Sequence, residues 1–267
     1  MSIPKSDATE VKVLIAIPCY NCENQISRVL MELDRVFVGN DQIKGIVVID
    51  NRSVDNTVLA AKNALNLMQK SEQVKIYVNE KNYGLGGSHK VAFQLCQDFG
   101  CNYLAVVHGD NQADPNDLAG MIRTAIEKRN CAILGSRFMS SSQLRNYSII
   151  RTLGNKILNR LYSLLTLRKI TDLGSGLNLF FMDEKIMRIL GKCDDGFTFN
   201  MDLLLGMIKN RLCYLFFPIK WKTEDEISNA KTLQVGLRTA LKILSWRFGI
   251  LNNPYTPLDS YKTRQVL

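Results

Sequence analysis

The sequence lacks the features of a protein that spans a membrane or is secreted. No segment approaches the run of about 18 consecutive apolar residues that a membrane-spanning helix needs. The first ten residues are mostly polar and have no apolar centre of the kind that a signal peptide contains. We therefore expect a cytoplasmic protein, with peripheral contact at the inner face of the cell membrane as an open alternative.

The sequence also has little that indicates a zinc or redox site. Its seven cysteines are scattered, mostly in apolar runs, and the odd number is typical of reduced thiols. Cys19 and Cys22 form a C-x-x-C pair, but no second pair or histidine lies at the spacing of a zinc site. We interpret both as ordinary loop residues, with a zinc or redox site as the less favoured alternative.

Acidic residues are outnumbered, because 34 lysines and arginines stand against 25 aspartates and glutamates, which gives a net charge of +9. This balance favours polyanionic partners, which include nucleic acid, an anionic membrane leaflet and phosphorylated small molecules. Repeats, low-complexity tracts and clear linkers are absent. The simplest division is therefore a single domain over residues 1–267.

Apolar runs typical of strands alternate with helix-like segments in the first half of the chain. The strands are expected at Val11–Pro18, Lys44–Asp50, Val74–Asn79 and Asn102–His108, and the helices at Asn24–Phe37, Asn56–Met68 and Gly87–Phe99. Ile26, Val29, Leu30 and Leu33 share one face of the first helix. The alternation predicts an α/β fold with a mostly parallel central sheet and helices on both faces, and a Rossmann-like nucleotide-binding half.

The second half is less regular. Helices are expected at Asp117–Lys128, Phe199–Ile208 and Leu233–Phe248, and strands at Ala132–Ser136, Leu177–Met182 and Cys213–Trp221. We divide the chain into a nucleotide-binding half (residues 1–115), an acceptor-binding half (residues 116–230) and an amphipathic C-terminal extension (residues 231–267).

Small polar clusters follow three of the expected strands. They are Pro18-Cys19-Tyr20-Asn21, Asp50-Asn51-Arg52-Ser53-Val54-Asp55 and His108-Gly109-Asp110-Asn111-Gln112. Ligands of parallel sheets bind outside the carboxyl ends of the strands, so we expect the three clusters to meet at one crevice. Asp50 can accept hydrogen bonds from a base or ribose, whereas a helix cap fully explains Ser53 and Asp55.

The third cluster indicates a cation site. If the segment is extended, alternate residues project the same way, and His108, Asp110 and Gln112 lie side by side. They offer a nitrogen, a carboxylate and an amide oxygen to Mg²⁺ or Mn²⁺, with diphosphate oxygens and water completing the shell. The alternative is that His108 is a satisfied residue at the strand end and Asp110 only forms a turn.

A glycine-rich turn over residues 82–90 leads into the third helix. Its glycines would let backbone N–H groups approach a phosphate or sugar, and a helix N-terminus favours negative charge. The turn is not the dinucleotide fingerprint, which would directly follow the first strand. It is an unspecific signal when taken alone.

Taken in order, these motifs resemble family 2 glycosyltransferases of the GT-A fold, and most of all the dolichyl- or polyprenyl-phosphate sugar synthases. The resemblance runs from about Val11 to Trp221. It rests on Pro18-x-Tyr20-Asn21, Asp50-Asn51-x-Ser53-x-Asp55, Asn82-x-Gly84-x-Gly86-Gly87, His108-Gly109-Asp110-x-Gln112-x-Asp114-Pro115, Gly135-Ser136-Arg137-Phe138, Asp172-Leu173-Gly174-Ser175-Gly176 and Phe199-Asn200-Met201-Asp202-Leu203-Leu204.

The resemblance implies an inverting transfer of a sugar from a UDP- or GDP-linked donor to a polyprenyl phosphate or a cell-surface glycan, with Mg²⁺ or Mn²⁺ as cofactor. It places the catalytic roles on Asp202, as the base or its support, and on Asp172 and Arg137, which would face the sugar or acceptor. Asp110, Gln112 and His108 would hold the metal. The nucleotide site would comprise Pro18, Tyr20, Asn21, Asp50, Ser53, Asn82, Gly86, Gly87, Lys90, Gly109 and Asp110.

The sequence departs from the family pattern at several positions. His108 replaces the aspartate that usually opens the metal motif, Cys22 replaces an acidic residue, and Asn51 replaces the second aspartate of its turn. A late Arg-x-x-Gly-x-Ser-Lys element appears only as Ser228-Asn229-Ala230-Lys231. Lys231 is either a phosphate contact or an exposed loop residue.

The acceptor decides whether a base is needed. A sugar hydroxyl must lose a proton to a base, whereas a phosphate is already ionised near pH 7.

Two rival functions have less support. A sugar-nucleotide nucleotidyltransferase would carry a glycine- and arginine-rich signature after the first strand, and a non-catalytic polyanion-binding protein, such as an RNA-binding one, would have no use for the motif at residues 108–112.

The segment from Ser140 to Thr171 is basic and apolar, with no acidic residue. Its basic residues are Arg145, Arg151, Lys156, Arg160, Arg168 and Lys169, and they alternate with Ile149, Ile150, Leu153, Ile157, Leu161, Leu164 and Leu165. Such a segment can lie on an anionic leaflet, and the helix Leu233–Phe248 with Arg238, Lys242, Trp246 and Arg247 can add to the contact. The alternative is that both apolar stripes pack into the core.

Overall fold

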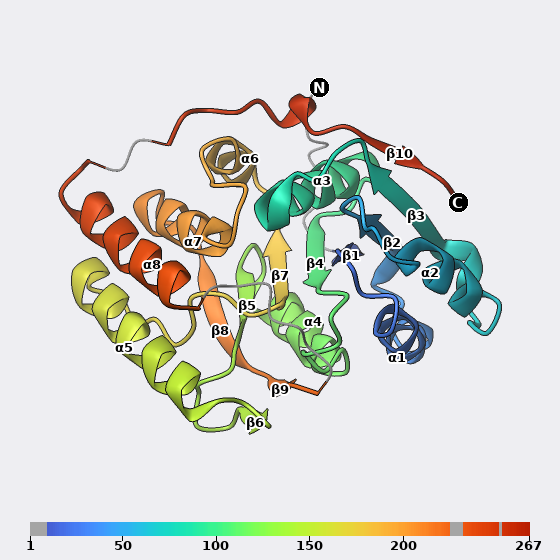
Figure 1. Cartoon of the computed structure of the whole chain (residues 1–267), viewed down its shortest axis with the longest axis horizontal. Helices are drawn as coiled ribbons and strands as arrows, with labels where there is room; N and C mark the ends of the chain where they lie inside the picture. The colour runs from blue at the N-terminus through green and yellow to red at the C-terminus, as the bar shows by residue number, and fades with distance from the viewer. Residues whose placement is uncertain (1–9, 225–231, 251–252) are drawn as a thin grey trace.

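The computed structural model describes residues 10–224, 232–250 and 253–267, which form a mixed α/β fold around one large sheet (Figure 1). The strands of this sheet are β1 (Val13–Cys19), β2 (Ile43–Asp50), β3 (Val74–Asn79), β4 (Tyr103–Val107), β5 (Ala132–Ser136), β7 (Leu177–Phe181), β8 (Tyr214–Pro218) and β10 (Thr263–Gln265). Their spatial order is β10-β3-β2-β1-β4-β7-β5-β8.

The half of the sheet around β1 is parallel. β1 pairs in parallel with β2 on one side and β4 on the other, and β2 pairs in parallel with β3. All seven residues of β1 are buried, as expected for an apolar strand covered on both faces. The predicted α/β class with a mostly parallel sheet is confirmed, and the carboxyl ends of β1, β2 and β4 lie at the same edge.

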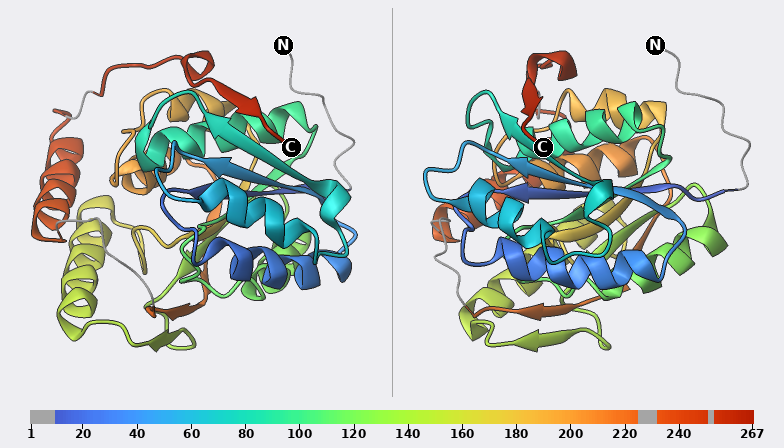
Figure 2. Two further views of the ribbon diagram at one scale, coloured as in Figure 1. Left: turned by 45° about the vertical axis from the view of Figure 1, so that its right-hand side comes forward. Right: turned by 90° about the vertical axis from the view of Figure 1, so that its right-hand side faces the viewer.

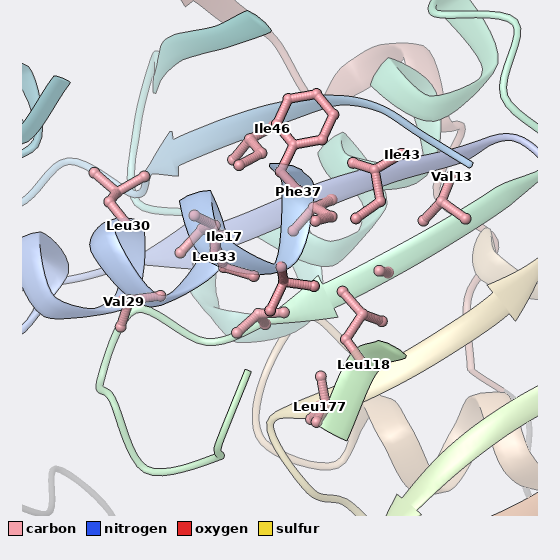
Figure 3. Packing of buried hydrophobic residues seen from close by; sticks show 14 of the residues in the cluster. Val13, Ile17, Val29, Leu30, Leu33, Phe37, Ile43, Ile46, Leu118 and Leu177 are labelled. Atoms are coloured by element: carbon pink, nitrogen blue, oxygen red, sulfur yellow. The ribbon is translucent and has the colours of Figure 1, made fainter. Parts of the chain in front are cut away.

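Helices cover both faces of the sheet (Figure 2). One face packs against α1 (Ile26–Val38), α2 (Thr57–Leu65) and α4 (Asp117–Lys128), and the other against α3 (Gly84–Asp98), α6 (Glu184–Leu190) and α7 (Phe199–Lys209). The predicted apolar face of α1 is confirmed. Figure 3 shows Val29, Leu30, Leu33 and Phe37 of this helix against Ile17 of the sheet.

The second half departs from the expected pattern. β7 runs antiparallel to both of its neighbours, β4 and β5. The expected strand Cys213–Trp221 is divided into β8 and β9 (Lys220–Lys222), and β9 pairs with β6 (Gln143–Arg145) in a separate small sheet. The strands β6 and β10, helix α6 and the short 3-10 helices Ser71–Gln73 and Leu258–Ser260 were not predicted, because each is too short to show a period.

The expectation of seven reduced thiols is wrong for Cys131 and Cys213, which form a disulfide. These residues immediately precede β5 and β8, which pair in parallel from Ala132 and Tyr214 onward. The strand register therefore brings the two thiols together, although they are 82 residues apart in the sequence. The other cysteines are free and buried.

Helices α5 (Ile149–Thr166) and α8 (Thr232–Arg247) pack side by side at one end of the molecule (Figures 1 and 2). Tyr162 is fully buried between them, and its hydroxyl donates to the carbonyl oxygen of Thr239 at 2.9 Å. The interpretation of their apolar stripes as core is wrong for most of these residues, which are exposed. Among the described residues, no helix has the length and hydropathy required to cross a bilayer.

Residues near the C-terminus return to the first half of the chain. β10 pairs antiparallel with β3, and Tyr261 is buried against α3. The Nζ atom of Lys90 donates to Asp195 Oδ1 at 2.7 Å and to the Tyr261 hydroxyl at 2.9 Å, and this hydroxyl donates to Asp195 Oδ1 at 2.6 Å. Burial alone would lower the pKa of Lys90, but Asp195 and Tyr261 raise it. We call Lys90, Asp195 and Tyr261 the C-terminal clasp.

We expect Tyr261→Phe to lower the free energy of unfolding by about 1–3 kcal/mol, because it removes the hydroxyl that bridges a buried ammonium and a carboxylate. Tyr255→Phe is the matched control, since Tyr255 is largely exposed and the same atom is removed. Urea unfolding of both variants measures the difference. An equal effect of the two substitutions would show that the clasp does not stabilise the fold.

Candidate functional site

The polar clusters after β1, β2 and β4 meet at one edge of the sheet, as the sequence predicts. Cys19 of β1 lies opposite Asp50 of β2, and the N–H of Gly109, just beyond β4, donates to the carbonyl oxygen of Pro18 at 3.1 Å. The pKa of the Cys19 thiol is raised well above its ordinary value by Cys22, by burial, and then by Asp50 and Asp110. Both carboxylates therefore lie close to the end of β1.

Asp50 is buried and has an unused acceptor. Its Oδ2 accepts the N–H of Ser53 at 3.2 Å, while its Oδ1 is buried without a partner among the described residues. An unpaired buried carboxylate oxygen is costly, and such groups are rare unless a ligand completes them. Asp50 is thus suited to accept hydrogen bonds from a ribose hydroxyl or a base N–H.

The loops after β1 and β2 are joined to one another by hydrogen bonds. Asn21 has a φ of 53°, donates its N–H to Ser53 Oγ at 3.0 Å and accepts the N–H of Val54 at the same distance. Asp55 caps α2, as expected, by accepting the N–H of Thr57. Asn21 and Ser53 therefore fix the loop shape with their own polar groups, whereas the neighbouring Tyr20 side chain stays 42% exposed.

Asn51 is the centre of a buried network, which the sequence interpretation treated only as a departure from the family. Its Nδ2 donates to Asn82 Oδ1 at 2.8 Å and to the carbonyl oxygen of Gly84, and its Oδ1 accepts from Asn79 Nδ2 and from the N–H of Tyr83, both at 2.9 Å. An aspartate could not make the two donations. The two donations therefore explain why residue 51 is an asparagine and not the aspartate of the family pattern. The bond from Asn51 also shows that Asn82 holds the turn before α3 in place.

The segment from His108 to Gln112 is a turn, so the prediction that it is extended is wrong. Asn111 has a φ of 58°, and the N–H of Gln112 donates to Asp110 Oδ1 at 3.2 Å. The His108 ring packs over Gly176, and its Nε2 lies 3.0 Å from Nε2 of His89. We therefore withdraw His108 as a metal ligand, because its Nε2 is paired with another histidine.

Asp110 is the best-placed residue for a cation. Burial raises the pKa of its carboxyl group to about 6, while the backbone N–H of Gln112 and the charge of Arg137 lower it. No group of three or more histidine, cysteine or acidic side chains suited to a metal occurs among the described residues. Asp110 therefore offers one carboxylate, and a hard cation at this position would need diphosphate oxygens and water to complete its shell.

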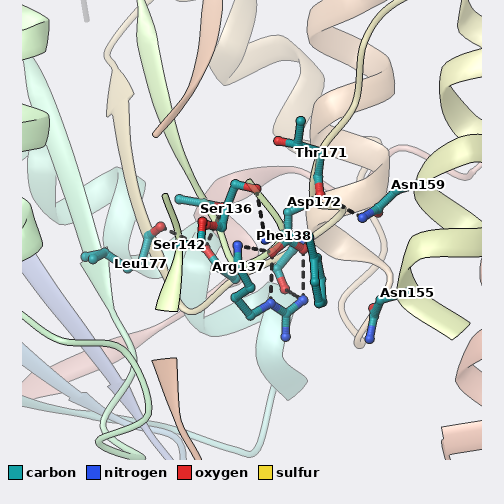
Figure 4. Close-up of polar contacts among 12 residues, drawn as sticks. Ser136, Arg137, Phe138, Ser142, Asn155, Asn159, Thr171, Asp172 and Leu177 are labelled. Atoms are coloured by element: carbon teal, nitrogen blue, oxygen red, sulfur yellow. Dashed lines mark hydrogen bonds and ion pairs between the residues drawn. The ribbon is translucent and has the colours of Figure 1, made fainter. Parts of the chain in front are cut away.

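Arg137 and Asp172 form a buried ion pair (Figure 4). Arg137 Nε and Nη2 donate to Asp172 Oδ2 and Oδ1, both at 2.8 Å, and Nη2 also donates to the Gly174 carbonyl at 2.9 Å. Burial alone would lower the pKa of Arg137, but Asp172, and to a smaller degree Tyr147 and Asp110, raise it. Arg137 therefore stays protonated near Asp110, and Asp172 balances its charge.

The glycine-rich turn has a different role from the one predicted. The N–H groups of Gly86 and Gly87 donate to the carbonyl oxygen of Asp195 at 2.7 and 3.4 Å, and a Cβ at Gly86 would lie 2.2 Å from the Asp194 carbonyl oxygen. Lys90 belongs to the C-terminal clasp. We therefore withdraw Gly86, Gly87 and Lys90 from the nucleotide site, because protein groups already occupy their donors.

Asp202 is engaged by the protein through one of its two carboxylate oxygens, while its Oδ1 is buried without a partner among the described residues. Its Oδ2 accepts from Lys242 Nζ at 2.6 Å, from the N–H of Asp194 at 2.9 Å and from Asn253 Nδ2 at 3.0 Å. Burial raises the pKa of Asp202, against the opposing effect of Lys242. The residue joins α7 to α8 and to residue 253, and this arrangement does not support its assignment as the catalytic base.

Sequence reasoning missed the partners of these residues. His108 pairs with His89, Lys90 with Asp195 and Asp202 with Lys242. The available sequence signal was the acidic run Asp194-Asp195 before a glycine. The predicted phosphate contact at Lys231, in Ser228-Asn229-Ala230-Lys231, lies outside the described residues.

Comparisons with known proteins identify the family of this chain. The family model described as Glycosyl transferase family 2 matches residues 14–186. A dolichyl-phosphate N-acetylglucosaminyltransferase of Methanococcus voltae that uses UDP-N-acetylglucosamine is 24% identical over 249 residues, which cover 89% of this chain and 96% of that protein. An uncharacterized protein of Methanocaldococcus jannaschii is 25% identical over 87% of this chain and 91% of its own length.

Solved structures show the same fold at low sequence identity. Glucosyl-3-phosphoglycerate synthase from Mycobacterium tuberculosis, in complex with Mn²⁺, UDP and glucosyl-3-phosphoglycerate, superposes with a TM-score of 0.64 and 12% identity, covering 95% of this chain and 86% of that one. The same enzyme with Mn²⁺, UDP-glucose and glycerol 3-phosphate gives a TM-score of 0.64 at 13% identity, over 91% and 82% of the two chains. Because the family model spans more than half of the sequence, this chain belongs to glycosyltransferase family 2 and has the GT-A fold.

Proposed function

We propose that this glycosyltransferase moves a sugar from a nucleoside diphosphate to a polyprenyl phosphate, with Mg²⁺ or Mn²⁺ bound between Asp110 and the diphosphate. The observation that carries the proposal is the convergence of Asp50, with its unpaired Oδ1, and Asp110 on either side of the end of β1. The Methanococcus voltae relative is named for the same two kinds of substrate, and the mycobacterial neighbours contain Mn²⁺ with UDP.

The donor side follows from the chemistry of these groups. Asp50 would accept hydrogen bonds from the nucleoside. Pro18 lies near the end of the neighbouring strand β1, and the exposed Tyr20 directly follows this strand. A divalent cation, when bound, would compensate the charge that develops on the departing diphosphate. Asp110 would hold this cation, and the protonated Arg137 lies near it in its ion pair with Asp172.

The acceptor side favours a phosphate. In an inverting displacement, an acceptor oxygen forms a bond to the anomeric carbon as the bond to the diphosphate breaks, and the electron pair leaves with the diphosphate. A hydroxyl acceptor needs a base for its proton, but the carboxylate of Asp202 is already paired with Lys242. A phosphate acceptor is ionised near neutral pH and needs no base, so a glycan hydroxyl has less support.

The two rival functions are set aside. A nucleotidyltransferase or a non-catalytic polyanion-binding protein would not match the glycosyltransferase family model over residues 14–186. The buried orphan oxygen of Asp50 also has no use in a protein that only binds RNA through surface charge.

The proposal is tested by incubation with UDP-, GDP- and TDP-sugars and a short-chain polyprenyl phosphate, with Mn²⁺ or with a chelator. We expect a glycosylated lipid phosphate in equal molar amount to the released nucleoside diphosphate, and about a hundredfold or greater loss with the chelator. Release of nucleotide without any acceptor would mean hydrolysis. Transfer to glycan hydroxyls in place of the lipid would refute the phosphate acceptor.

We expect Asp110→Asn to lower turnover by about 100-fold or more, because it removes the carboxylate proposed to hold the cation. The thermal stabilisation that UDP gives in the presence of Mn²⁺ should also disappear. Asp114→Asn is the charge-matched control, since Asp114 pairs with Lys220 and lies four residues away. If both variants lose activity equally, charge in the turn matters and Asp110 is not the ligand.

We expect Asp202→Asn to lower the free energy of unfolding by about 3 kcal/mol, because it leaves Lys242 without its carboxylate in a largely buried position. Transfer to a lipid phosphate by the folded variant should fall by less than about tenfold, since no base is required. Asp98→Asn, at the exposed end of α3, is the control for the loss of one charge. Abolished transfer by a fully folded Asp202→Asn would restore the base assignment.

A further inference from the structure

Helices α5 and α8 present large apolar side chains to solvent. On α5, Ile149 and Ile150 are 85% and 83% exposed, and Leu153, Ile157 and Leu164 are also exposed. After α5 the chain adds Leu167. On and after α8, the exposed apolar residues are Leu237, Leu241, Leu244, Phe248 and Ile250. A concentration of this size on two neighbouring helices exceeds the single exposed apolar residues that are normal on protein surfaces.

These residues form one stripe on each helix, turned away from the protein. Positions 149, 153, 157 and 164 fall within about a quarter turn of one another at 3.6 residues per turn, opposite the buried residues Asn159, Tyr162 and Thr166. Positions 237, 241, 244 and 248 repeat in the same way, opposite Thr239 and Ile243. α5 and α8 pack side by side, so the two stripes lie on neighbouring helices (Figures 1 and 2). We call the two exposed stripes together the α5–α8 surface.

The charged side chains on α5 and α8 are all basic. Neither helix contains an acidic residue, and the exposed basic residues on them and in the segment after α5 are Lys156, Arg160, Arg168, Lys169, Arg238 and Arg247. Lysine and arginine beside an exposed apolar stripe are typical of helices that lie in the plane of a membrane surface. A second copy of the chain would bring like charges together, so charge disfavours self-association.

We propose that the α5–α8 surface docks on an anionic lipid bilayer, with both helices lying in the plane of the membrane and their apolar stripes at the headgroup level. The apolar side chains bury area in the leaflet, and the basic residues bind acidic headgroups. The occupant is a lipid surface and not a protein groove, because the two stripes are long and the charged side chains on both helices are all basic.

The docked orientation places the candidate site beside the membrane. Tyr147, immediately before α5, lies with its hydroxyl 3.4 Å from Arg137 Nη1 and 3.2 Å from Asn155 Nδ2. The start of α5, which carries the most exposed isoleucines, is therefore connected directly to the Arg137–Asp172 ion pair. This consequence rests on the proposed function: a polyprenyl phosphate held in the leaflet would reach the site along this end of α5.

Flotation with lipid vesicles tests the inference without any sugar donor. The full chain should bind vesicles of phosphatidylcholine with phosphatidylglycerol, bind less to phosphatidylcholine alone, and dissociate as salt screens the charges. The double variant Leu153→Glu, Leu241→Glu should reduce the partition coefficient at least about tenfold, because it places charge in both stripes. The matched control is Leu59→Glu, Leu67→Glu, which changes equally exposed leucines in and just after α2.

A charge-reversal pair provides a second, independent variant. Lys156→Glu with Arg160→Glu on α5 should abolish the preference for phosphatidylglycerol, whereas Arg123→Glu with Lys128→Glu on α4 should leave it within about twofold. All four variants should transfer sugar to a short-chain, water-soluble acceptor as the unaltered protein does, since the altered side chains are exposed.

Vesicle binding that is absent, or equal in the stripe variants and their controls, would overturn the inference. So would a dimer in sedimentation that Leu153→Glu with Leu241→Glu dissociates, combined with no vesicle binding. The proposed function fails separately: a protein that binds vesicles but transfers no sugar from any donor keeps the docking surface and loses the reaction.

Discussion

The burial of β1 on both faces is the constraint on which the rest of the structure depends. A strand without solvent contact along its length has no place for a polar side chain, and it accepts polar residues only where it ends. The parallel pairing with β2 and β4 then sets Asp50 and Asp110 beside the same strand end. The candidate site is therefore a geometric result of the buried sheet.

Most of the first half of the fold could be predicted because its signals are local. The apolar period of α1 and the continuous apolar run of β1 are written in neighbouring residues, and both were placed to within about two residues. The convergence of Asp50 and Asp110 followed from a general rule for parallel sheets. These predictions needed no knowledge of distant contacts.

The predictions that failed depend on partners far away in the sequence. Lys90 pairs with Asp195, which is 105 residues later, and Asp202 pairs with Lys242, which is 40 residues later. The sequence alone does not show that a lysine beside a glycine-rich turn, or an aspartate in a matching motif, has a partner, because that partner is distant in the sequence. The expected metal role of His108 failed because its Nε2 is paired with His89, 19 residues earlier, and the extended shape predicted for the segment failed because Asn111 has a left-handed conformation.

The network around Asn51 and the C-terminal clasp both support the site indirectly. Asn51 ties the end of β2 to the turn before α3, and the clasp holds α3 against Tyr261. Their side chains maintain the shape of the site. A motif match does not distinguish such residues from those that bind a ligand, so several of them were assigned to ligand binding.

The strand β10 has a consequence for how the protein behaves in a crowded solution. By pairing with β3 over residues 77–79, it covers backbone N–H and C=O groups that would otherwise be unpaired at an exposed edge of the sheet. Unprotected margins of this kind template strand addition by neighbouring molecules. Three residues near the C-terminus thus protect this edge of the sheet from strand addition. They lie at the carboxyl end of β3, and the loop that holds Asp50 lies at the carboxyl end of β2.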